Sequence, residues 1–147
     1  MRSHAHARTM SLVLVLLAAV SCTSPVTPGP ARRVVVVGSD KPVAVAGTNA
    51  VLEVFVTDDY GTPVPDALVS FGIYNLRETI PIGDWVRTGA DGVGRLEIPI
   101  PYSVYGRTVI SVGQTVVTAK LETHGADSRC HFFLNVVAAP PAAFATA

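Results

Sequence analysis

The chain has few charged and few aromatic side chains. Only 15% of its 147 residues are charged and 7% are aromatic, with a single tryptophan, Trp85. Eleven basic and eleven acidic residues cancel, so the chain lacks the basic surface with which nucleic-acid-binding proteins neutralise phosphates. A hydrophobic fraction of 49% is too high for a disordered chain. The length fits one domain, and we expect no nucleic-acid partner.

The sequence also lacks local signatures of catalysis and metal binding. No Gly-x-Ser-x-Gly elbow occurs, and the only pairing of a nucleophile with a base is Cys130 with His124 or His131. Neighbours on a strand point to opposite faces, so Cys130 and His131 are poorly placed to share a zinc ion. Four acidic residues offer oxygen ligands for calcium: Asp58, Asp59, Asp66 and Asp91. They form no Asp-x-Asp-x-Asp-Gly loop. We therefore expect no catalytic residue, no metal and no cofactor.

The first 21 residues have the composition of an export signal. Arg2 and Arg8 make the start positive, and no acidic residue occurs there. Nine apolar residues follow in a row from Leu12 to Val20, which is too short a run to span a bilayer, since that needs about 20 residues. This pattern is typical of a cleaved secretory signal peptide, which we assign to residues 1–21.

The residues around the expected cleavage point allow two interpretations. The sequence Ala-Val-Ser-Cys at residues 19–22 resembles the lipobox of bacterial lipoproteins. That resemblance implies an acylated Cys22 that anchors the mature chain to a membrane, and Thr23 after it implies the outer membrane in a host with two. The alternative is an ordinary small-x-small cleavage site, which gives a secreted or periplasmic protein. Cys22 could then form a disulfide with Cys130.

Two segments of low complexity flank the expected domain. Residues 22–31 contain three prolines, which favour an extended polyproline conformation and therefore a tether. Residues 138–147 are rich in alanine and proline, and we expect a flexible tail. The folded domain is then expected over residues 32–137.

Within 32–137, apolar and polar residues alternate with a period of two, as in half-buried strands. In 49–57, for example, Leu52, Val54 and Val56 share one face. Seven or eight strands of this kind, with no helices between them, predict an all-β antiparallel sandwich. The expected strands are 32–37 with its continuation 42–46, 49–57, 67–74, 85–88, 95–100, 108–112, 117–122 and 130–137.

Three stretches carry recognisable motifs. Residues 54–71 hold an Asp-Asp-Tyr-Gly-Thr-Pro-Val-Pro turn between two strands, residues 87–96 hold a Thr-Gly-Ala-Asp-Gly turn, and residues 116–121 read Val-Val-Thr-Ala-Lys-Leu. Together they resemble bacterial immunoglobulin-like domains of the invasin and intimin type, and more distantly carboxypeptidase-regulatory-like and transthyretin-like sandwiches. The resemblance implies an immunoglobulin-like β-sandwich without chemistry of its own. The insert 75–84 and the pair Gly113-Gln114 depart from it.

The turn residues have structural interpretations. Gly61 and Gly92 suit backbone positions with positive φ. Asp58 and Asp91 are placed to accept hydrogen bonds from backbone amides a few residues ahead.

Four aromatic residues are candidates for contact with a partner or ligand. Trp85 and Tyr74 flank the insert, and Tyr102 and Tyr105 lie in the loop 101–107. Exposed aromatic rings can stack on sugars or anchor a protein partner. The alternative for Trp85 is the core tryptophan of the sandwich.

The sequence thus predicts a non-enzymatic module of the cell envelope that acts as a lipid-anchored spacer, adhesion or scaffolding domain. Its partners would be the membrane, through the lipid, and a protein or glycan. The alternative is a module that binds a small ligand or carbohydrate with the loops 75–85 and 101–107.

Overall fold

The computed structural model describes residues 26–74, 79–122 and 128–141. The expected signal peptide, Cys22 and most of the expected tail lie outside these ranges. All regular elements in the described ranges are strands. None of the described segments forms a long apolar helix of the kind that crosses a bilayer.

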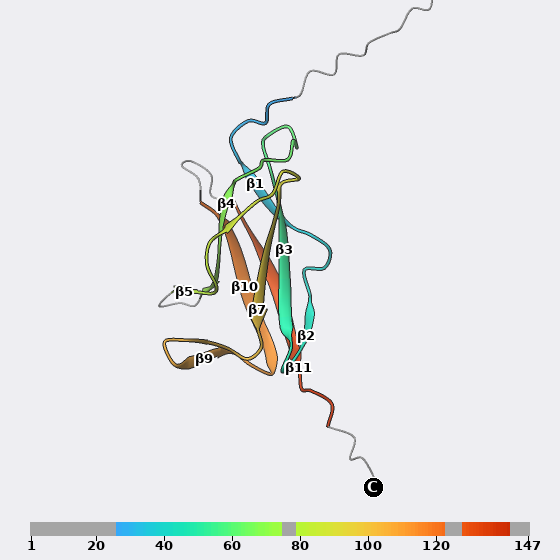
Figure 1. The fold of residues 1–147 in the computed structure, drawn as a ribbon, viewed down its shortest axis with the longest axis vertical. Coiled ribbons are helices and arrows are strands. Elements are labelled where there is room, and N and C mark those ends of the chain that lie inside the picture. Colours follow the sequence, from blue (N-terminus) through green and yellow to red (C-terminus); the bar gives the residue numbers. More distant parts are fainter. Residues whose placement is uncertain (1–25, 75–78, 123–127, 142–147) are drawn as a thin grey trace, which may run out of the picture.

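Two sheets pack face to face and enclose the core (Figure 1). The first is antiparallel and has the order β1 (Arg33–Val36), β3 (Asn49–Thr57), β7 (Val93–Pro99). The second has the order β2 (Val43–Val45), β11 (Arg129–Val137), β10 (Gly113–Leu121), β4 (Leu68–Tyr74), β5 (Thr79–Pro81), with β6 (Val86–Arg87) also paired to β4. A separate hairpin consists of β8 (Tyr102–Val104) and β9 (Arg107–Ile110).

This arrangement confirms the predicted all-β, immunoglobulin-like β-sandwich. One pairing differs from the antiparallel prediction, because β2 runs parallel to β11. The chain bends between β1 and β2, where Gly38 has a φ of +74°. It thereby passes from the edge of one sheet to the edge of the other without reversing direction (Figure 1).

The core lies between the sheets and follows the predicted alternation. The aromatic rings of Phe132 in β11 and Phe71 in β4 are buried there with their centroids 6.3 Å apart. Full burial of one such side chain contributes roughly 1.5–3 kcal/mol. The buried faces of the longer strands consist of Leu52, Val54, Val56, Val69, Phe71, Leu96, Ile98, Val117, Ala119, Leu121, Phe132, Leu134 and Val136.

Three segments predicted as irregular are strands. Thr79–Pro81 lies in the predicted irregular insert but forms β5 by pairing with β4. The loop 101–107 contains β8 and the start of β9. β10 begins at Gly113, four residues before the predicted start, because Gly113 and Gln114 pair with Val136 and Asn135 of β11. In each case pairing with another strand imposes extended structure on residues without strong alternation.

Asp58 organises the turn after β3 and also holds the linker. Its Oδ1 accepts hydrogen bonds from the backbone N–H groups of Tyr60 and Thr62, both at 2.9 Å, and its Oδ2 accepts one from Gly29 at 2.9 Å. The bond from Gly29 is the largest cause that lowers the pKa of Asp58, because the bonds favour the charged form. The predicted capping role is confirmed, and contact with the domain begins at Gly29 rather than at residue 32.

The turn before β7 is built in the same way. Asp91 Oδ1 accepts a hydrogen bond from the backbone N–H of Val93 at 3.0 Å. Gly92 and Gly61 have φ values of +75° and +82°, which confirms the prediction that both positions need a left-handed backbone.

Candidate functional site

The β8–β9 hairpin forms around a two-residue turn. Tyr105 and Gly106 have φ values of +49° and +75°, and two successive positive values define the type I′ turn that suits tight hairpins. Asparagine is the usual residue at the first position, because a left-handed backbone costs other side chains roughly 1–2 kcal/mol. Tyr105 nevertheless occupies it, with 95% of its surface exposed. Strain of this kind is concentrated at functional positions rather than at positions that serve packing.

The base of the hairpin is fixed to the sandwich. Ile110 at the end of β9 is fully buried. The Tyr102 hydroxyl accepts a hydrogen bond from the backbone N–H of Gly83 at 2.7 Å. Gly83 has a φ of +65°, and a Cβ there would lie 2.6 Å from Leu96 Cδ1. The hairpin and the segment that follows β5 therefore hold each other in place.

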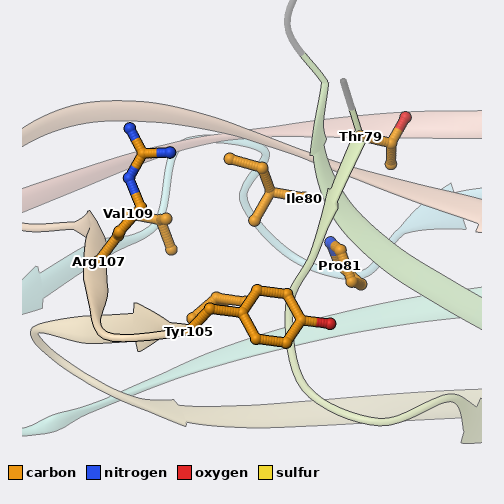
Figure 2. Close-up of a pocket in the computed structure, with 7 residues that line it drawn as sticks. Thr79, Ile80, Pro81, Tyr105, Arg107 and Val109 are labelled. Carbon is orange, nitrogen blue, oxygen red and sulfur yellow. The ribbon is translucent and has the colours of Figure 1, made fainter. Parts of the chain in front are cut away.

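A groove of about 300 Å³ lies between β5 and the hairpin (Figure 2). Its lining consists of Thr79, Ile80, Pro81, Val104, Tyr105, Arg107 and Val109. Side chains alternate between the two faces of a strand, and all three residues of β5 line the groove, so the groove follows the edge of β5. That edge ends the second sheet. The volume is at the lower limit of the range for ligand sites.

The hairpin contributes one face to this groove. Arg107 and Val109 are two positions apart on β9, and Val104 is paired with Arg107 across the hairpin. Ser103 and Thr108 take the opposite face, with their hydroxyl oxygens 3.3 Å apart and exposed. The groove face thus combines two valines with one cation.

Within the described part of the chain, Arg107 is the only charged residue in the groove lining. Salt bridges among the described residues join other cations to acids, as for Arg87 with Asp66 at 3.1 Å. None of the salt bridges found in the described ranges includes Arg107. Its guanidinium is exposed at the groove (Figure 2).

The four aromatic residues predicted as contact candidates do not form one site. Tyr105 lines the groove, whereas Tyr102 is half-buried and its hydroxyl holds the Gly83 amide. The side chain of Tyr74 lies outside the described part of the structure. Trp85 is 60% exposed and is not part of the groove lining.

The interpretation of Trp85 as a core tryptophan is wrong. Val86 in β6 is paired with the fully buried Val69 of β4 and packs against the core. Alternation along the strand then directs the preceding side chain, Trp85, to solvent.

Sequence reasoning did not single out the groove residues Ile80, Arg107 and Val109. The insert and the loop 101–107 were both identified as candidate binding loops, but their residues show no spacing that links them. The groove arises only because the hairpin folds beside β5, which is a contact between segments distant in sequence.

The acidic residues of the turns do not converge on one point. Asp58 is bound to backbone amides, Asp59 lies 3.7 Å from Arg32, and Asp66 pairs with Arg87. Across the described ranges, no group of three His, Cys, Asp or Glu side chains is placed to hold a metal ion.

Cys130 and His131 face opposite sides of β11, as predicted from alternation. Cys130 is half-buried against the core, and this burial raises the pKa of its thiol to about 11. The exposed His131 has its Nδ1 2.9 Å from Thr118 Oγ1 on β10. His131 therefore does not activate the thiol, which stays protonated at neutral pH. His124 lies outside the described residues.

No family model matches the sequence, and neither does any curated protein. Among solved structures, the chain is similar to a mutant complex of titin M10 and an obscurin-like 1 Ig domain, with 12% identity over 76% of this chain and 99% of that chain and a TM-score of 0.44. It is also similar to the Lin-41 filamin domain, with 13% identity over 74% of this chain and 98% of that chain and a TM-score of 0.44. At such low identity neither likeness says anything about function.

Proposed function

We propose that the protein is a non-enzymatic immunoglobulin-like module of the cell envelope, anchored through a lipid on Cys22, which acts as a spacer that presents an adhesive or scaffolding surface. The observation that carries this proposal is the polarity of the sandwich. The described chain begins at one end of the long axis, and the hairpin lies toward the other end (Figure 1).

The linker contacts support this geometry. Gly29 is bound to Asp58, so the proposed tether would comprise residues 22–28, which as polyproline would reach about 20 Å. β3 adds nine residues along the sandwich, or roughly 30 Å. A lipid on Cys22 would thus leave the hairpin end far from the membrane surface and open to a partner.

The chemistry of the described residues supports a role without catalysis. The buried acid, Asp58, accepts bonds from backbone amides, and the thiol of Cys130 has a raised pKa. The Asp58 carboxylate is thus occupied by backbone amides, and His131, the base next to Cys130 in sequence, faces the other side of β11. A binding role needs only the exposed surface.

The mature N-terminus tests the anchoring. The full chain would be expressed with its own signal in a bacterium, and its N-terminal peptide would be analysed by mass spectrometry. We expect an acylated Cys22 and a membrane-bound protein, and we expect Cys22→Ala to move the protein into the soluble exported fraction. An unmodified N-terminus at residue 22 would contradict the lipid anchor and favour free secretion.

A second candidate function is favoured by the groove. A module that binds a small ligand or a glycan through the loops 75–85 and 101–107 is supported by the site that β5 and the hairpin enclose together. Binding in a glycan array or pull-down should then weaken in Tyr105→Ala and persist in Trp85→Ala, because only Tyr105 lines the groove. The reverse result would place the binding surface elsewhere.

A further inference from the structure

We propose that the groove between β5 and the hairpin binds a short extended peptide segment of a partner protein, with an acidic and an aliphatic side chain two positions apart. This inference rests on the second candidate function and names its ligand. Three independent features of the groove support it: the strand edge on one side, the apolar lining, and the exposed guanidinium of Arg107.

The strand edge offers backbone groups to an extended ligand. The Ile82 N–H donates to the Phe71 carbonyl at 3.0 Å, which fixes the hydrogen-bonding phase of the β4–β5 pair. Ile80, two residues earlier, therefore also directs its backbone groups to β4. Thr79 and Pro81 direct theirs outward along the groove. Proline has no N–H, so the edge offers one donor, from Thr79, and two carbonyl acceptors.

An extended peptide is the ligand that matches such an edge. Adding a strand to a sheet edge satisfies the backbone groups of both partners, while the side-chain pockets decide which sequence binds. The missing donor at Pro81 makes the ladder short, and it limits indiscriminate pairing with other strands. Affinity must then come mainly from side chains.

The hairpin face specifies those side chains. Arg107 and Val109 are two residues apart on β9, a separation of about 6.6 Å. Alternate residues of an extended peptide share one face at the same spacing. A carboxylate opposite Arg107 would therefore place the next side chain on that face opposite Val109, where an aliphatic group fits.

The charge of the lining selects an acid rather than a neutral or basic group. Among the lining residues that the structure describes, Arg107 is the one charged side chain. A guanidinium binds a carboxylate through two parallel hydrogen bonds, and the fork geometry favours arginine over lysine for this purpose. The exposed Tyr105 ring at the hairpin tip borders the same space (Figure 2) and can cover the bound segment.

Fluorescence anisotropy with labelled pentapeptides tests the proposal. The probes are Thr-Glu-Thr-Val-Thr, whose acid and valine are two positions apart, and its neutral counterpart Thr-Gln-Thr-Val-Thr, each titrated with the full exported chain carrying Cys22→Ala to keep it soluble. We expect the acidic peptide to bind at least about tenfold more tightly than the neutral one, because a charge-assisted pair is lost in the latter. Equal binding of the two peptides would overturn the proposal.

Two arginine variants locate the site. Arg107→Gln should reduce binding of the acidic peptide to the level of the neutral peptide and leave the neutral peptide unaffected, while Arg107→Lys should recover only part of the loss. The matched control is Arg87→Gln, which removes another exposed arginine outside the groove and should change nothing. An unchanged affinity in Arg107→Gln, with the fold intact by circular dichroism, would refute the assignment.

Amide hydrogen exchange and a competition assay distinguish failure of the peptide proposal from failure of the second candidate function on which it rests. Peptide binding should slow exchange of the Thr79 amide. Free glutarate or glucuronate that bound as tightly as the acidic peptide would overturn the peptide proposal while the groove remained a small-ligand site. Absence of binding for all these probes would contradict both the peptide proposal and the second candidate function.

Discussion

Replacing Gly92 by alanine should destabilise the protein more than the same change at Gly61, although both glycines have left-handed backbones. Their φ values are +75° and +82°. A Cβ on Gly92 would lie 2.8 Å from the carbonyl oxygen of Val56 and 3.0 Å from Pro63 Cβ, whereas a Cβ on Gly61 would meet nothing within 4 Å. Both variants therefore lose free energy of unfolding because alanine disfavours a left-handed backbone, and only Gly92→Ala loses more through the steric clash.

The magnitudes follow from these two terms. A left-handed backbone costs a non-glycine residue roughly 1–2 kcal/mol, which is the full expected loss for Gly61→Ala. At position 92 the obstructing oxygen belongs to a strand, and it accepts a hydrogen bond from the Val64 N–H at 3.0 Å. Moving it would strain that bond, and overpacking of this kind typically costs about 1–3 kcal/mol. We expect a total loss of roughly 2–5 kcal/mol for Gly92→Ala.

Urea unfolding followed by circular dichroism measures both variants. The slope of the unfolding free energy against urea should stay constant, and the midpoint should fall in proportion to the loss of stability. A difference of about 1–3 kcal/mol between the variants is the expected steric term. Equal losses would show that the close approach to Val56 does not constrain the turn, and would refute this account of why glycine is required at position 92.

Other perturbations test the core, the buried polar groups and the titrating residues. Phe132→Ala should cost about 3–5 kcal/mol in urea unfolding, and a loss below 1 kcal/mol would contradict its burial. Thr88→Val should cost about 1–3 kcal/mol, because the buried hydroxyl accepts from one backbone N–H and donates to one carbonyl; an unchanged stability would refute this role. The lowered pKa of Asp58 contributes stability that is present above its ordinary value of 3.8 and is lost as the pH falls through the folded value, so unfolding midpoints at pH 7 and pH 3 should differ less in Asp58→Asn than in the parent chain. With a pKa of about 11 against an ordinary 9.0, Cys130 should react with iodoacetamide about 100-fold more slowly in the folded than in the unfolded chain, and equal rates would contradict its burial.

Alternation was sufficient to predict the long strands and their buried faces. In β3 and β11 every second residue is apolar over nine positions, so the period is unambiguous. β6 has only two residues, and a strand so short shows no alternation from which the facing of Trp85 could be determined. The large tryptophan ring favoured a core position on average, but the pairing of Val86 with Val69 directs it outward.

The sheet edges were less predictable than the centre. The residues Thr79–Pro81 alone do not indicate a strand, which forms only by pairing with β4. The parallel pairing of β2 with β11 depends on the path of the loop that follows Gly38. The candidate groove combines both difficulties, because it requires β5 to form and the hairpin to fold beside it. Local sequence contains the residues Tyr105 and Arg107 but does not indicate their neighbours.

The parallel pairing of β2 with β11 has a mechanical consequence. Backbone hydrogen bonds join Ala46 to Val137, Asn135 to Pro42, and Phe133 to Asp40. Force applied between an N-terminal anchor and the C-terminus would pull these two segments in opposite directions along their common axis. The bonds would then carry load simultaneously in shear instead of opening one after another. The β2–β11 pair would therefore resist mechanical separation of the two ends of the domain.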